Sequence, residues 1–319
     1  MIKWIFTHGD GDGVCAGALA LAANPDAKVF FTHPSGLLED LENVKNGDSA
    51  IICDISLPED NLAVILKRFL EIDGSGELIY VDHHPLPENL QLENIPGKVI
   101  HSISSSASEL TYTLFQEKLT WLMSRVAIYG AVSDYLDNTP VISALLCRWD
   151  KRTIYFETGV LVQGLEGFRR DHEFKRKLVF HLASCQPPSL HPGLLEAALE
   201  NTRREDEIIR SLSSYIKVYG DIAYALNVPF SAGKTATYVR ALANTLVGVA
   251  GEERKGFIDM SLRTCEKGID LNSILRRISL KFGGSGGGHP QAAGARIPKE
   301  NFPKFIEELD IAVKSRAGE

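Results

Sequence analysis

Short apolar runs alternate with segments of helical periodicity over the first 140 residues of the chain. Short apolar runs bounded by turn residues are typical of buried strands, whereas apolar residues three or four positions apart are typical of helices. The predicted strands are residues 2–7, 28–32, 50–53, 78–81 and 98–103, and the predicted helices are residues 13–23, 61–70 and 110–117. Alternation of strand and helix predicts an α/β fold with a parallel sheet.

The pattern changes twice further along the chain. Helical periods dominate from residue 138 to 215, and strand-like runs return at 222–228 and 256–263. They are followed by a helix at 271–282, a glycine-rich turn, a strand ending at 297 and a final helix from 302. A chain of 319 residues is long enough for two domains. We therefore predict a first α/β domain at 1–140, a helical connector at 141–216 and a smaller α/β domain at 217–319.

Composition narrows the class of protein. With 44% hydrophobic and 24% charged residues, the chain has the make-up of a soluble globular protein. A net charge of −7 argues against a protein that coats nucleic acid nonspecifically, although it is compatible with a nuclease that has a local basic groove. The five cysteines are scattered, and no secretory signal or long apolar segment is present. These features predict a cytoplasmic protein without a membrane anchor.

Acidic and imidazole side chains follow the predicted strands of the first domain. The strand-end residues are His8, Asp10, Asp12, Asp54, Asp82, His83 and His84, and Asp134 follows a predicted helix. Carboxyl ends of parallel strands are where open α/β sheets build their sites. Paired carboxylates suit hard divalent ions, and a mixture with imidazole favours Mn²⁺ over Mg²⁺. The alternatives are local: a polar turn with an Asp N-cap after the first strand, and cap or turn roles for Asp54 and Asp134.

The adjacent residues His83 and His84 are predicted to have different roles. Adjacent side chains of an extended segment point in different directions, so one of His83 and His84 can bind metal while the other faces substrate. The carboxylate of Asp82 can orient a ligating imidazole through its second nitrogen.

Residues 283–294, GGSGGGHPQAAG, carry a histidine within a glycine-rich segment, a pattern suited to phosphate. Arg263, shortly before it, has a guanidinium fork that also suits phosphate, although a surface salt bridge is the alternative. The basic stretch 169–177 either follows a nucleic-acid backbone or forms a solvated helix face.

In order and spacing, the strand-end motifs resemble the four motifs of the DHH phosphoesterase family. The glycine-histidine segment resembles that of the associated DHHA1 domain. The resemblance covers residues 1 to about 140 and about 217 to 315. In one respect the chain differs: relatives of the NrnA type begin with H-x-x-x-D-x-D, whereas Asp10 comes two residues after His8, as in compact archaeal RecJ-like proteins.

The resemblance implies roles for individual residues. The metal ligands for two Mn²⁺ ions, with Mg²⁺ as a substitute, are His8, Asp10, Asp12, Asp54, His83 and Asp134, with Asp54 as the bridging carboxylate. The residues placed around the reacting phosphate are Asp82, which stands beside the ligands, and His84, which faces the phosphate. The residues expected to bind substrate are Gly286, Gly287, Gly288, His289 and Arg263.

The resemblance also implies an activity. We expect a Mn²⁺-dependent RecJ-like exonuclease that hydrolyses single-stranded DNA or RNA, or short oligonucleotides, to mononucleotides with metal-activated water. The alternatives are an NrnA-like oligoribonuclease or pAp phosphatase, and a noncatalytic replication scaffold. Expected partners are the nucleic acid itself and a replication or repair protein, while the oligomeric state stays open.

Overall fold

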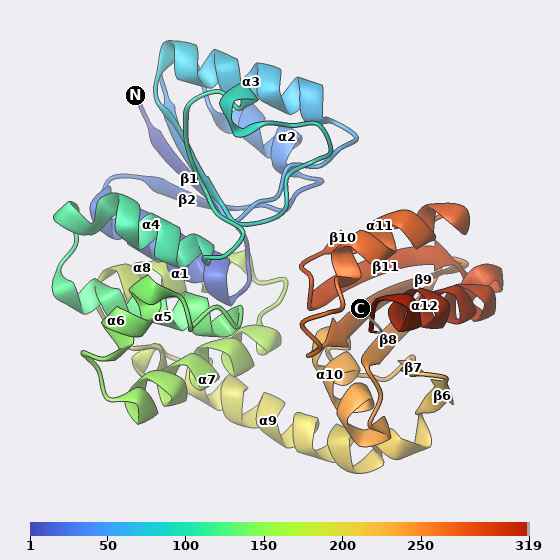
Figure 1. The fold of residues 1–319 in the computed structure, drawn as a ribbon. Coiled ribbons are helices and arrows are strands. Elements are labelled where there is room, and N and C mark those ends of the chain that lie inside the picture. Colours follow the sequence, from blue (N-terminus) through green and yellow to red (C-terminus); the bar gives the residue numbers. More distant parts are fainter. Residues whose placement is uncertain (318–319) are drawn as a thin grey trace. The chain divides into compact units, whose positions relative to one another are not determined.

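The computed structural model describes residues 1–317, which form two compact units that divide between Asn201 and Thr202 (Figure 1). The strands of the first unit are β1 (Lys3–Thr7), β2 (Lys28–Phe31), β3 (Ser49–Cys53), β4 (Leu78–Asp82) and β5 (Lys98–His101). Its helices are α1 (Gly11–Ala23), α2 (Leu37–Asp40), α3 (Leu62–Ser75), α4 (Ala107–Phe115), α5 (Ser124–Ser133), α6 (Pro140–Leu146), α7 (Lys151–Gly167), α8 (His172–Ala183) and the first part of α9 (Leu194–Ser211). Among the described residues, no helix is both long and apolar enough to cross a membrane.

The five strands of the first unit form a parallel sheet in the order β2-β1-β3-β4-β5. This confirms the predicted α/β class and the parallel pairing. Buried side chains alternate between two cores, because successive side chains of a strand point to opposite faces. Ile51 and Cys53 pack against α1, α4 and α5, whereas Ala50 and Ile52 pack on the opposite face with α3.

The helices that follow α5 are part of the first unit. Ile154 and Leu161 of α7 and Leu178 and Leu182 of α8 are buried in the same core as α1. Much of the predicted connector therefore packs on the side of the sheet that α1 covers, instead of standing apart from the first domain. The basic stretch 169–177 consequently lies against this domain.

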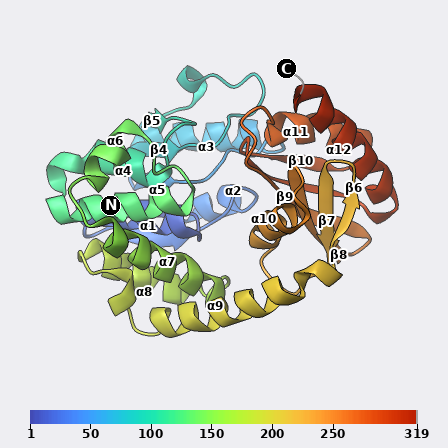
Figure 2. The ribbon, with the colours of Figure 1, turned by 60° about the horizontal axis from the view of Figure 1, so that its bottom comes forward.

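The second unit contains a mixed sheet in the order β10-β11-β9-β8-β7-β6. Its elements are β6 (Lys217–Tyr219), β7 (Ile222–Leu226), α10 (Ala232–Ala243), β8 (Val247–Arg254), β9 (Phe257–Thr264), α11 (Leu271–Lys281), β10 (Ser285–Gly288), β11 (Ala292–Pro298) and α12 (Phe302–Ala317). Helices α11 and α12 pack on one face, and α10 packs on the other (Figure 2). The second α/β domain is confirmed, although sequence analysis missed α10 and β8.

The glycine-rich segment differs from its prediction, because Ser285–Gly288 forms the edge strand β10 instead of a turn. A Cβ on Gly286 would lie 2.6 Å from Oγ of Ser279 and 3.1 Å from Cβ of Leu275, both in α11. Only glycine lets the strand approach that helix so closely. The turn comes later, where the backbone N–H of His289 donates to the carbonyl of Ala292 at 2.9 Å.

Candidate metal centre

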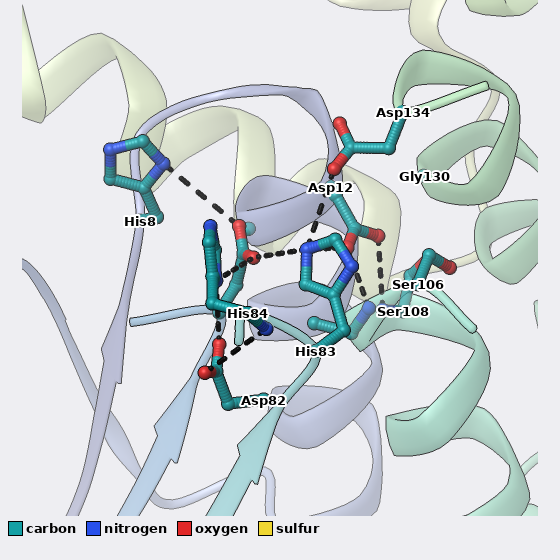
Figure 3. A network of polar contacts seen from close by, with 12 residues as sticks. His8, Asp12, Asp82, His83, His84, Ser106, Ser108, Gly130 and Asp134 are labelled. Atoms are coloured by element: carbon teal, nitrogen blue, oxygen red, sulfur yellow. Dashed lines mark hydrogen bonds and ion pairs between the residues drawn. The ribbon is translucent and has the colours of Figure 1, made fainter. Parts of the chain in front are cut away.

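The strand order of the first unit brings the polar motifs together. Strands β1, β3 and β4 are neighbours, so the segments that follow them meet at one edge of the sheet. Asp54 follows β3. His8 follows β1 and His83 follows β4, while Asp134 comes in from the C-terminal end of α5 (Figure 3). The structure thus gathers every metal ligand predicted from the sequence in one place.

Asp54 stands at the middle of this cluster. The residue is 2% exposed, and among the described residues neither carboxylate oxygen accepts a hydrogen bond. Oδ1 lies 3.2 Å from Nε2 of His83 and 4.0 Å from Nδ1 of His84, and Oδ2 lies 3.9 Å from Nδ1 of His8. A buried carboxylate whose oxygens lack hydrogen-bond donors fits a ligand for a cation.

His83 extends the cluster toward the helices. Its Nε2 lies 3.5 Å from Oδ2 of Asp134 and 3.9 Å from Oδ2 of Asp12. The ring planes of His83 and His84 are 65° apart, so the two imidazoles face different groups, as their adjacency predicts. Three groups of the first unit bring their ligand atoms within 4.8 Å of one another, namely His8 with Asp10 and Asp54, Asp12 with Asp54 and His83, and Asp54 with Asp82 and His84. Because Asp54 belongs to all three, it has the position that a bridging ligand requires.

Asp82 and His84 form a hydrogen-bonded pair beside the cluster. Oδ1 of Asp82 lies 2.9 Å from Nδ1 of His84 (Figure 3). Oδ2 of Asp82 accepts from the hydroxyl of Tyr80 at 3.0 Å. Burial lowers the pKa of His84, but the Asp82 carboxylate outweighs burial and leaves that pKa raised. The pair therefore favours a protonated imidazole held in one orientation.

His8 and Asp10 form the other side of the cluster. Nδ1 of His8 lies 2.7 Å from Oδ2 of Asp10, while Oδ1 of Asp10 accepts from the backbone N–H of Gly13 at 3.0 Å. Asp10 is thus the N-cap of α1, as the local alternative expects, and the same carboxylate still faces the cluster. The two roles are compatible because a carboxylate has two oxygens.

Asp12 is held by contacts that sequence analysis missed. Its two carboxylate oxygens accept from the backbone N–H groups of Ala107 at 2.6 Å and Ser108 at 3.0 Å, in the first turn of α4. A Cβ on Gly130 of α5 would lie 2.6 Å from Oδ1 of Asp12 and would also overlap the hydroxyl of Ser108. Glycine at position 130 therefore leaves room for the Asp12 side chain. From this segment, sequence analysis identified only Asp134 as a site residue.

The cluster is strongly acidic for its degree of burial. Burial raises the pKa of Asp54 well above its usual range, and the carboxylates of Asp10 and Asp12 raise it further. Burial also raises the pKa of Asp12. Carboxylates crowded in a low-dielectric site favour protonation unless positive charge is added. A divalent cation supplies that charge, so the donor set fits Mn²⁺ or Mg²⁺ on chemistry as well as on geometry.

The predicted substrate residues lie in the second unit. Gly286, Gly287 and Gly288 form β10, and His289 begins the turn to β11. Arg263 is in β9, on the far side of β11, and its guanidinium lies close to Gly233 in the first turn of α10. The glycine strand and Arg263 are therefore two strands apart in one sheet.

Comparison with known proteins was made by sequence and by fold. The DHHA1 domain model matches residues 229–315, which lie in the second unit. No curated protein sequence matches the chain significantly. Three solved structures cover almost all of it: a DHH-domain protein described as a member of the s1p family of ribosomal proteins, RecJ from Thermus thermophilus in complex with Mn²⁺, and the pGpG-specific phosphodiesterase PggH from Vibrio.

Residues 229–315 thus form a DHHA1 domain, and the chain as a whole has the fold of the RecJ-like DHH phosphoesterases. The ribosomal-protein relative has a TM-score of 0.74 at 14% identity and covers 98% of this chain and 86% of its own. RecJ has a TM-score of 0.70 at 17% identity, with coverages of 98% and 52%, so the chain spans about half the length of RecJ. PggH has a TM-score of 0.58 at 14% identity, with coverages of 99% and 100%. At these identities the likeness establishes the phosphoesterase fold. It does not transfer the substrate of any of these relatives to this chain.

Proposed function

We propose that the protein is a Mn²⁺-dependent phosphodiesterase, and specifically an exonuclease that removes mononucleotides from single-stranded DNA or RNA. The observation that carries this proposal is Asp54, a buried carboxylate shared by three groups of ligand atoms at the edge of the sheet. The RecJ relative, whose structure contains Mn²⁺, supports the choice of ion. Free cysteines at all five positions fit the proposed cytoplasmic location.

The proposed chemistry needs no protein nucleophile. When bound, a pair of divalent cations supplies a water of lowered pKa and neutralises the phosphoryl oxygens. His8, Asp10, Asp12, Asp54, His83 and Asp134 would hold the ions. Asp82 keeps His84 oriented, and we propose that Nε2 of His84 donates a hydrogen bond to a phosphate oxygen as negative charge develops there.

The first test is product analysis on single strands labelled at either end, with Mn²⁺ present. Exonuclease action gives a ladder of products that shorten stepwise from one end, and the end that is attacked gives the polarity. The same assay with metal chelated is the control. Release of internal fragments, or turnover of dinucleotides and pAp alone, would contradict the exonuclease proposal.

A second candidate is an enzyme for short substrates, in the manner of an NrnA-like oligoribonuclease or pAp phosphatase. The match to PggH, which is described as specific for a dinucleotide, spans all of that chain and favours this candidate. Comparing kcat/KM for dinucleotides with that for long strands separates the two. The proximity of these acidic and imidazole side chains within the first unit supports an enzyme over a noncatalytic scaffold.

Substitution of His289 with alanine tests the proposed role of the second unit. We expect KM for a single-stranded substrate to rise about tenfold, because a hydrogen bond to a charged phosphate is lost. Manganese content, measured by elemental analysis, should stay at the wild-type value. Loss of manganese in this variant would instead place His289 among the metal ligands.

A further inference from the structure

Lys175 is a buried lysine in α8, within the basic stretch that sequence analysis left between a nucleic-acid contact and a solvated face. The residue is 4% exposed, whereas lysine is rarely buried without a compensating partner. Its Nζ donates to the backbone carbonyl of Arg169 at 2.8 Å. At this position, therefore, neither alternative describes the residue.

The ammonium group of Lys175 lies against the loop that follows β1. A Cβ on Gly9 would lie 2.6 Å from Nζ of Lys175, so the ammonium occupies the space beside a residue that has no side chain. Gly9 stands between His8 and Asp10, two of the predicted metal ligands. A fixed positive charge is thus placed directly behind one side of the metal centre.

Several charged groups near Lys175 influence the pKa of its ammonium group. Burial lowers the pKa of Lys175, and the carboxylate of Asp10 is the strongest of the groups that oppose this effect. Glu166 and Asp171 act in the same direction as Asp10, and Arg169 acts against them. The main electrostatic partner of the buried ammonium is therefore a residue of the metal centre.

We propose that Lys175 is a positioning residue whose charge balances the acidic cluster in the metal-free protein and thereby limits how tightly the centre holds a divalent cation. The inference rests on the proposed function only in requiring that the centre binds such a cation. The ammonium attracts the carboxylates while no ion is bound, and it repels an ion that arrives beside Asp10. The Lys175 charge therefore stabilises the ion-free centre and destabilises the ion-bound centre.

This arrangement has a use in turnover. The five carboxylates of the site repel one another when no ion is bound, and they attract divalent cations strongly. A nearby ammonium moderates both extremes without occupying a ligand position. A purely structural lysine would stabilise both states alike, and its removal would leave ion binding unchanged.

The test is Mn²⁺ titration of the full-length protein by calorimetry, comparing wild type with Lys175→Met. Methionine retains much of the length and removes the charge. We expect the dissociation constant for Mn²⁺ to fall about tenfold, as expected for removing one charge at short range from a divalent ion in a partly hydrated site. The unfolding midpoint of metal-free Lys175→Met should be lower than that of the wild type. The increase in unfolding midpoint on adding Mn²⁺ should be larger in the variant.

The matched control is Lys177→Met, which removes an exposed lysine from the same helix and should leave the dissociation constant unchanged. A second variant, Gly9→Ala, pushes the ammonium away without removing it and should tighten Mn²⁺ binding by a smaller factor. Equal or weaker binding in both Lys175→Met and Gly9→Ala overturns the inference. Failure of the wild type to bind Mn²⁺ at all would instead contradict the proposed function, and the inference with it.

Discussion

Replacing Asp54 with asparagine is expected to lower kcat by about a thousandfold or more, because losing several kcal/mol of metal-based stabilisation of the transition state has that effect. Asp54 is the carboxylate that belongs to all three ligand groups of the first unit, so its loss weakens the hold on both proposed ions. Single-turnover hydrolysis of a labelled strand measures the change. A variant that retains most of its activity would contradict the assignment of the centre.

Asparagine is the informative substitution because of the backbone at this position. Asp54 has φ of +61°, a left-handed conformation that asparagine adopts more easily than alanine. Alanine would add backbone strain to the loss of the carboxylate and would confuse the two effects. Asp26→Asn, at an exposed carboxylate between α1 and β2, is the matched control and should retain full activity.

The same variant should be more stable than the wild type when no metal is present. Burial, followed by Asp10 and Asp12, raises the pKa of Asp54, so in the folded protein its charged form is disfavoured. A carboxylate with a raised folded-state pKa destabilises the protein above its unfolded-state pKa, and this penalty disappears as acid protonates it in both states. The gain in unfolding midpoint should therefore be present at neutral pH and vanish in acid, as measured by thermal unfolding in chelator.

Asp12→Ala is expected to abolish turnover as well, but with the opposite effect on stability. The side chain of Asp12 accepts hydrogen bonds from the backbone N–H groups of Ala107 and Ser108, and alanine leaves these two buried donors without acceptors. Each such donor costs about 1–3 kcal/mol, so the metal-free protein should lose about 2–4 kcal/mol of unfolding free energy.

Chemical denaturation in chelator measures the effect at Asp12, with Asp54→Asn as the comparison. A lower unfolding free energy in Asp12→Ala and a higher one in Asp54→Asn would show that Asp12 anchors a helix, whereas Asp54 only binds ions. An unchanged unfolding free energy in Asp12→Ala would show that the α4 amides are satisfied in another way.

The sequence predicted the framework of the centre because the framework depends on local patterns. Apolar runs ending at Thr7, Cys53 and Val81 are read from periodicity alone, and a parallel sheet necessarily places the residues after these strands at one edge. Polar residues directly after those runs, such as His8 and Asp54, could therefore be identified as a cluster without coordinates.

The contacts that the sequence did not predict join distant segments. No local signal shows that Asp12 meets the start of α4, nearly a hundred residues away, or that Lys175 lies against Gly9. In the basic stretch 169–177, periodicity did not distinguish the buried lysine from its solvated neighbours. The glycines of β10 were taken for a turn because glycine favours turns, whereas here they allow close packing on α11.

The scattered origin of the ligands has a consequence for biosynthesis. A nascent chain that has emerged from the ribosome only as far as the end of β4 and His83 carries His8 and Asp54 as well, but Asp134 and the α4 amides that anchor Asp12 are still unmade. The complete ligand set therefore exists only after α5 and Asp134 have been translated. Until then, the early histidines and aspartates are ordinary hydrophilic side chains on an unfinished sheet.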